Sequence, residues 1–209
     1  MTRKHAAKAQ DPTLVLRLLT PQLVDALGVV FRGNWGAGCW CMYPRLTAAQ
    51  MRGLPGSGTA TQRWREAMTE LARRPIAPGL LAFEGEDAVG WIAIAPRGEL
   101  ARVAASRATP PVDDQELWVI PCITVRRSAR GRGIAVALIG AAVAYAGEHG
   151  ASIVEAYPRA GAERTADDNV FFGTEPLFRR AGFRTARQAL ENRPRNWPPR
   201  LAMRITAHL

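Results

Sequence analysis

The hexapeptide Arg130-Gly-Arg-Gly-Ile-Ala135 has the residue types that a phosphate-binding turn requires. Gly131 and Gly133 allow backbone conformations in which successive N–H groups point outward. The arginines contribute positive charge, and a helix that starts directly after the turn adds unpaired N–H groups and the positive end of its dipole. The sequence therefore predicts a phosphate site at Arg130, Gly131, Arg132, Gly133, Ile134 and Ala135.

The hexapeptide is flanked by two apolar segments. One apolar run ends at Val125, and residues 134–147 contain no charged side chain. This pattern predicts a strand, a turn and a buried helix. Two common nucleotide signatures do not fit, because G-x-G-x-x-G would need glycine at Val136 and a P-loop would need Gly-Lys followed by Ser or Thr.

The composition is that of a basic globular protein. Of 209 residues, 28 are Lys or Arg and 18 are Asp or Glu, which gives a net charge of +10. This excess favours polyanionic partners, such as nucleic acid or coenzyme A. The basic residues are spread along the chain, and no basic helix with interleaved aromatic residues stands out. We therefore interpret most of the excess positive charge as side chains on the solvated surface. Nucleic acid is therefore the less favoured partner.

One domain is expected over residues 13–209, preceded by a disordered tail at residues 1–12. The tail is polar and basic, unlike a secretory signal, and the run 134–147 is shorter than the roughly 20 residues of a membrane span. We therefore expect a cytoplasmic protein without a membrane segment. The three cysteines and three histidines show no spacing typical of a disulfide framework or a zinc site, so no metal is predicted.

Apolar runs and turn signals predict the element order β-α-α-β-β-β-α-β-α-β-β. Residues 79–84 and 88–95 are separated by Gly85-Glu-Asp87, which indicates an antiparallel hairpin. Residues 117–125 and 151–157 are connected by the apolar helix, so these strands should be parallel neighbours. The expected fold class is α+β, with three layers around a mixed central sheet.

The chain resembles the GNAT (GCN5-related) N-acetyltransferase superfamily in its element order and in two motifs. Residues 130–135 fit the Q/R-x-x-G-x-G/A signature, and Glu175-Pro-Leu-Phe-Arg-Arg-Ala-Gly-Phe183 is similar to the second GNAT motif. Three further stretches are similar to a bacterial subgroup of GNAT-like proteins with no settled substrate. They are Cys39-Trp-Cys-Met-Tyr43, Val89-Gly-Trp-Ile-Ala-Ile-Ala-Pro-Arg97 and Val154-Glu-Ala-Tyr-Pro158.

The resemblance implies that acetyl-CoA binds where the fourth and fifth strands splay apart. It assigns the pantetheine arm to the backbone of Ile123, Thr124 and Val125, and the pyrophosphate to residues 130–135. Pro121 supports such an opening, because a residue without an N–H group predicts a bulge or strand separation.

Acetyl transfer to an amine needs a deprotonated nucleophile and a proton for the leaving thiolate. Glu155 is the first candidate base, because a carboxylate in the apolar run 153–156 must be paired or functional. An ion pair with one of the arginines is the alternative. Glu116 is a weaker candidate, since it precedes Cys122 by six residues, roughly 20 Å along a strand.

The general acid departs from the family pattern, because many GNAT enzymes have a tyrosine where this chain has Phe178. Tyr157 and Tyr43 are then candidate acids. Otherwise solvent or the incoming amine protonates the thiolate, or acetyl transfer is weak or absent. We interpret Cys122, near the expected thioester, as a small buried thiol, because no histidine in the neighbouring motifs would activate it.

The loop Cys39–Arg45 is expected to shape the acceptor side of the cleft. The resemblance implies this position, because the first two helices and their connection cover that side in the GNAT fold. Trp40, Met42 and Tyr43 would then line an apolar pocket.

The expected function is therefore an acetyl-CoA-dependent N-acetyltransferase that moves an acetyl group directly to a primary amine of a small molecule or peptide. The alternatives are an acyltransferase for a longer acyl-CoA and a non-catalytic GNAT-like module that binds acyl-CoA or regulates. The expected partners are acetyl-CoA and an amine acceptor that the residues do not identify. Homodimer formation is left open.

Overall fold

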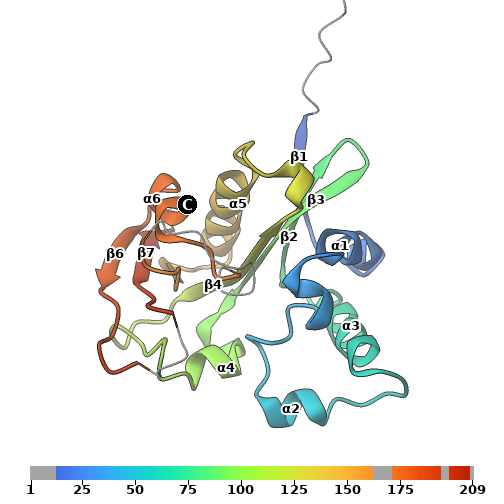
Figure 1. Cartoon of the computed structure of the whole chain (residues 1–209), viewed down its shortest axis with the longest axis horizontal. Coiled ribbons are helices and arrows are strands. Elements are labelled where there is room, and N and C mark those ends of the chain that lie inside the picture. The colour runs from blue at the N-terminus through green and yellow to red at the C-terminus, as the bar shows by residue number, and fades with distance from the viewer. Residues whose placement is uncertain (1–12, 162–170, 194–197, 208–209) are drawn as a thin grey trace, which may run out of the picture.

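The computed structural model describes residues 13–161, 171–193 and 198–207, and the tail predicted at residues 1–12 lies outside them. A seven-stranded sheet runs through these residues, with helices on both faces (Figure 1). The strands are β1 (Leu14–Leu18), β2 (Gly79–Glu84), β3 (Asp87–Pro96), β4 (Trp118–Val125), β5 (Ile153–Ala156), β6 (Arg184–Arg187) and β7 (Ala202–Thr206). The helices are α1 (Val24–Phe31), α2 (Ala48–Arg52), α3 (Ala60–Leu71), α4 (Ala101–Ala104), α5 (Ile134–Glu148) and α6 (Glu175–Arg180).

The strand order in the sheet is β1-β2-β3-β4-β5-β7-β6. Among the described strands, β4 and β5 form the one parallel pair, because α5 crosses over between them. The hairpin of β2 and β3 turns at Gly85, which has a φ of 61°. The predicted α+β class with a mixed central sheet is confirmed.

The sheet opens between β4 and β5, as Pro121 predicts. The parallel pairing runs from Trp118 with Val154 to Ile120 with Ala156, and it ends one residue before Pro121. On the other side of β4, the register with β3 shifts between Ala93 and Ala95, next to the same proline. Beyond this point β4 continues to Val125 and still pairs with β3, so its other edge faces the opening.

The chain returns to this opening after β5. The N–H group of Ile123 donates to the carbonyl oxygen of Phe171 at 2.8 Å, and the N–H group of Arg159 donates to the carbonyl oxygen of Gly173 at 3.1 Å. Gly173 has a φ of 80°, and a Cβ atom there would lie 2.7 Å from the Phe178 ring. Residues 171–173 therefore fill part of the space between β4 and the end of β5.

Two helical layers cover the sheet (Figure 1). The apolar helix α5 packs on one face of β2, β3 and β4, where Leu138, Ile139 and Ala142 are fully buried. Helices α1 and α3 lie on the other face, over Trp91 of β3 and Cys122 of β4. None of the described helices is long and apolar enough to cross a membrane.

Helix α2 is an additional helix, absent from the predicted element order. Its N-terminus carries a capping box, in which Thr47 accepts from the N–H group of Gln50 and the Gln50 side chain accepts from the N–H group of Thr47. The same Thr-x-x-Gln pattern at Thr59 and Gln62 starts α3. The capping signal was present in the sequence and would have predicted both starts.

Candidate active site

The turn between β4 and α5 has the backbone geometry that the glycines allow. Gly131 and Gly133 have φ values of 83° and 78°, which L side chains rarely adopt. Gly133 is the N-cap of α5, and no side chain caps this end of the 15-residue helix. The helix therefore directs its first N–H groups and the positive end of its dipole into the turn.

A cavity of about 470 Å³ opens at this turn. Its lining combines the glycine backbone and the start of α5 with two guanidinium groups, those of Arg130 and Arg180. Arg180 comes from the last turn of α6 and was not among the predicted site residues, although the two basic residues of that turn could have indicated it. Backbone N–H groups, a helix dipole and two arginines form a surface suited to phosphate.

A second cavity, of about 300 Å³, extends from the turn along the free edge of β4. It shares Val125, Arg130, Ala135 and Leu177 with the first cavity, so the two form one channel. The rest of its lining comes from β4, from the segment after β5 and from α6, with one residue after α1. These residues are Asn34, Ile123, Thr124, Phe171, Gly173 and Thr174. The channel therefore has a narrow, mostly apolar part and a basic end.

Alternate residues of β4 present their backbone to this channel. The N–H group of Arg126 donates to Val89 of β3 at 2.9 Å, whereas that of Ile123 donates away from β3, to Phe171. Since backbone groups alternate along a strand, Val125 faces the channel like Ile123, and Thr124 faces β3. The carbonyl oxygen of Val125 accepts from Nε of Arg130 at 3.1 Å.

Glu155 lies in a buried polar cluster beneath the opening. Its side chain has no exposed surface and lines neither cavity. Nε of Arg204 donates to Glu155 Oε2 at 2.6 Å, the Tyr157 hydroxyl donates to Oε1, and Nη1 of Arg97 lies 3.7 Å from Oε1. Arg204 also forms a bidentate pair with Asp113. This arrangement supports the ion-pair alternative for Glu155.

Tyr157 is not among the described residues that line the two cavities either. Its ring is buried, and its hydroxyl contacts Arg97 and Glu155. Burial and the nearby Glu155 carboxylate raise the pKa of this hydroxyl well above its ordinary value. The Pro-Arg end of β3 and the Glu-Ala-Tyr-Pro stretch of β5 thus meet in one polar cluster, which accounts for both stretches structurally.

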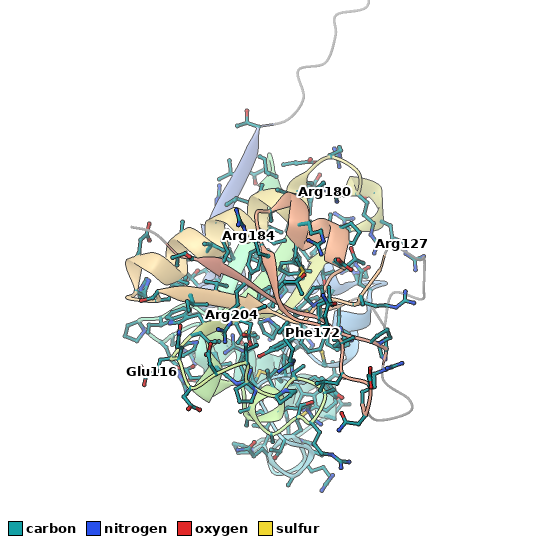
Figure 2. The ribbon with its side chains drawn as sticks, turned by 90° about the vertical axis from the view of Figure 1, so that its left-hand side faces the viewer. Glu116, Arg127, Phe172, Arg180, Arg184 and Arg204 are labelled. Atoms are coloured by element: carbon teal, nitrogen blue, oxygen red, sulfur yellow. The ribbon has the colours of Figure 1, made fainter. Side chains whose placement is uncertain are left out.

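Glu116 lies at the opposite end of β4 from the channel. It precedes β4 and lines a separate cavity with Trp118 and His149. Figure 2 shows Glu116 at the lower left of the molecule, far from Arg180 and Arg127 at the upper right. The structure therefore does not bring Glu116 to the residues of the phosphate turn.

The sequence profile of the Acetyltransferase (GNAT) family matches residues 44–169, which is more than half of the chain. The chain belongs to this family. No curated protein matches the sequence.

Solved GNAT structures share the fold at low identity. PaiA N-acetyltransferase from Thermoplasma acidophilum, in complex with coenzyme A, has 12% identity and a TM-score of 0.54, with 93% of this chain and 99% of that chain covered. YncA from Salmonella typhimurium, with its cofactor acetyl-CoA, has 15% identity and a TM-score of 0.52, with 93% and 94% covered. An acetyltransferase from Thermus thermophilus has 17% identity and a TM-score of 0.50, with 93% and 97% covered.

One residue of the GNAT signature points away from the channel. Nη2 of Arg132 lies 3.0 Å from Glu84 Oε2 at the end of β2, and Arg132 lines neither cavity. Its charge is therefore shared with a carboxylate. The two basic side chains that line the cavity at the turn are instead Arg130 of the signature and Arg180 of the second GNAT motif.

The Cys39–Arg45 loop of this GNAT chain reaches the channel only indirectly. Tyr43 packs edge-on against Phe171, with ring centroids 6.2 Å apart, and Phe171 lines the channel. Trp40 instead packs against Phe31 of α1, and Met42 is buried in the same core. Of the three side chains expected to line an apolar pocket, only Tyr43 therefore contacts a residue of the channel, whereas Trp40 and Met42 belong to the packing of the helical layer.

Proposed function

We propose that this GNAT protein transfers the acetyl group of acetyl-CoA directly to a primary amine of a small molecule or peptide. The observation that carries the proposal is the single channel from the β4 edge to the basic turn at Gly131 and Gly133. Its apolar part suits a pantetheine arm, and its basic end suits the pyrophosphate. PaiA and YncA, which share the fold, hold coenzyme A and acetyl-CoA.

Residues 130–135 and Arg180 would hold the phosphates of the donor. The backbone of Val125 would pair with an amide of pantetheine, since it faces the channel. The N–H group of Ile123 is occupied by the Phe171 carbonyl oxygen. Ile123 and Thr124 would therefore contribute mainly their side chains, which line the channel.

The part of the channel wall that the structure describes supplies no side-chain base. Its described lining contains no carboxylate, imidazole, phenol or thiol. We therefore assign deprotonation of the acceptor amine to water. The neutral amine then attacks the thioester carbon, the carbon–sulfur bond breaks, and the proton that the nitrogen loses passes through water to the thiolate. In this scheme no chemical step involves Glu155, Tyr157 or Glu116. A tyrosine hydroxyl at the position of Phe178 is not required either, because water carries the proton to the thiolate.

The first prediction concerns pH. An alkyl amine acceptor has a pKa near 10, so its neutral fraction rises about tenfold with each pH unit in the neutral range. We expect kcat/KM to rise about tenfold with each pH unit, and so about a hundredfold from about pH 6 to about pH 8, because no enzyme group titrates the step. A steady-state pH profile checks this. A plateau within that range would show a titrating group of the enzyme and would contradict the scheme.

The second prediction concerns the arginines at the turn. Arg130→Ala and Arg180→Ala should each weaken acetyl-CoA binding about tenfold, because each removes a charged donor from the phosphate cavity. Arg132→Ala should weaken it less, since Arg132 is paired with Glu84. Arg184→Ala is the matched control, a change on β6 outside the cavity. Calorimetry on the four variants decides, and equal losses at Arg132 and Arg180 would contradict the assignment.

Donor binding and transfer are tested separately. Calorimetry should show binding of acetyl-CoA and coenzyme A, and weaker binding of a coenzyme A fragment without the pyrophosphate. A panel of primary amines with thiol release as the readout should then reveal the acceptor class. Binding without thiol release from any amine would support the non-catalytic module, and preferred binding of a longer acyl-CoA would support the other alternative. A cytoplasmic location and homodimer formation stay predictions from the sequence.

A further inference from the structure

The side chain of Asn34, which follows α1, is fixed by its own helix. The backbone N–H group of Asn34 donates to the carbonyl oxygen of Phe31 at 2.8 Å, and its side-chain Nδ2 donates to the carbonyl oxygen of Val30 at 2.8 Å. Because Nδ2 is the donor end of the amide, the contact with Val30 sets the orientation of the group. The amide oxygen, Oδ1, is therefore left as an acceptor for another element.

This acceptor meets the guanidinium group of Arg130. Nη2 of Arg130 donates to Asn34 Oδ1 in a long hydrogen bond of 3.5 Å, and its Nε donates to the carbonyl oxygen of Val125 at 3.1 Å. Asn34 follows α1 on one face of the sheet, whereas Arg130 precedes α5 on the other face (Figure 1). The contact therefore joins the phosphate turn to the helical layer of the opposite face.

The contact between Asn34 and Arg130 lies where the two cavities join. Both residues line the narrow cavity along β4, and Arg130 also lines the cavity at the turn. Among the described lining residues of the narrow cavity, Asn34 is the one that the α1 side contributes. The others come from β4, the turn, α5, residues 171–174 and α6. Asn34 can therefore influence a ligand at the turn through Arg130, although it is not part of the turn.

Asn34 holds the arginine with a neutral group. Arg132 of the same turn provides a contrast, because its Nη2 lies 3.0 Å from the Glu84 carboxylate, which shares its charge. The amide oxygen of Asn34 and the carbonyl oxygen of Val125 carry no net charge, so neither of them cancels the charge of Arg130. An arginine loses rotamer freedom when it binds a ligand, and a partner that orders the side chain beforehand reduces this cost.

We propose that Asn34 is a positioning residue for acetyl-CoA, which orients the guanidinium group of Arg130 toward the pyrophosphate. This inference rests on the proposed function, because it requires Arg130 to bind the donor phosphates. Replacement of Asn34 by alanine leaves the charge of Arg130 in place but removes one group that orders its side chain. We expect Asn34→Ala to weaken acetyl-CoA binding about threefold, which is less than the loss expected for Arg130→Ala.

A double-mutant cycle with acetyl-CoA in calorimetry tests this role. Asn34→Ala should weaken binding about threefold in the wild-type chain and also in Arg180→Ala, because Arg130 is intact in both. In Arg130→Ala the same change should have no further effect, since the group that Asn34 orients is gone. Arg180→Ala is the matched background, because it removes the other arginine of the same cavity. An equal loss in both arginine backgrounds, or no loss in the wild-type chain, would overturn the proposal.

Fragments of the donor provide a second readout, because Asn34→Ala also removes the contact with Val30. ADP carries a pyrophosphate and pantetheine does not, so Asn34→Ala should weaken ADP about threefold in NMR titrations and leave pantetheine binding unchanged. An equal loss for the two fragments would show a structural effect on the whole channel and would overturn the role of Asn34.

The cycle separates this inference from the proposed function. If Arg130→Ala binds acetyl-CoA as tightly as the wild-type chain, the phosphate assignment itself is wrong. If Arg130→Ala weakens binding and Asn34→Ala adds its full loss to it, only the positioning role of Asn34 is wrong.

Discussion

Replacement of Glu155 by glutamine is expected to destabilise the protein strongly while its turnover per folded molecule stays close to wild type. The change removes the one carboxylate that Arg97 and Arg204 share beneath the opening. Breaking a buried ion pair leaves an uncompensated charge and costs about 3 kcal/mol or more. For a chain of this size, the melting temperature should fall by roughly 6 to 12 °C.

Turnover should survive this change because Glu155 lines neither cavity. Thermal melts and steady-state rates, with rates normalised to the folded fraction, measure the two effects on one sample. Glu116→Gln is the matched control, since Glu116 is exposed and should change neither quantity. A Glu155→Gln protein of wild-type stability with kcat lowered on the order of 10² would instead identify Glu155 as the base.

Replacement of Gly133 by proline should abolish measurable acetyl-CoA binding. Proline fixes φ near −65°, whereas Gly133 has a φ of 78°, so the turn cannot keep its shape. The substitution also removes an N–H group at the start of α5. The distorted turn would also disturb the packing of α5. The milder Gly133→Ala change is therefore the better quantitative test of acetyl-CoA affinity. We expect it to weaken binding about tenfold or more.

Gly150→Ala is the matched control for Gly133→Ala. The two glycines flank opposite ends of α5, have φ values of 83° and 78°, and leave open space for a Cβ atom. Both changes should lower stability by about 1 kcal/mol through the same left-handed backbone strain. Only Gly133→Ala should weaken acetyl-CoA in calorimetry, because only Gly133 lines the phosphate cavity. Equal affinities for the two variants would contradict the phosphate assignment.

The sequence by itself determined the turn at residues 130–135, the apolar helix after it and the break at Pro121. These features depend on local rules: glycine permits positive φ, an uncharged apolar run of helical length favours a helix packed against the core, and proline lacks an N–H group. Each of these rules acts within a few residues, so the amino-acid sequence is sufficient to predict these features. The family resemblance depends on the same stretches, and the family profile confirms it.

Only the tertiary structure decided which distant groups meet. Arg204 lies 49 residues after Glu155 and reaches it because β7 pairs with β5, a neighbour that the sequence order does not specify. Arg180 reaches the phosphate cavity through the packing of α6. The N–H group of Ile123 donates to the Phe171 carbonyl oxygen because the chain returns to the opening after β5. The side-chain types were visible in the sequence, but their roles depend on partners that topology selects.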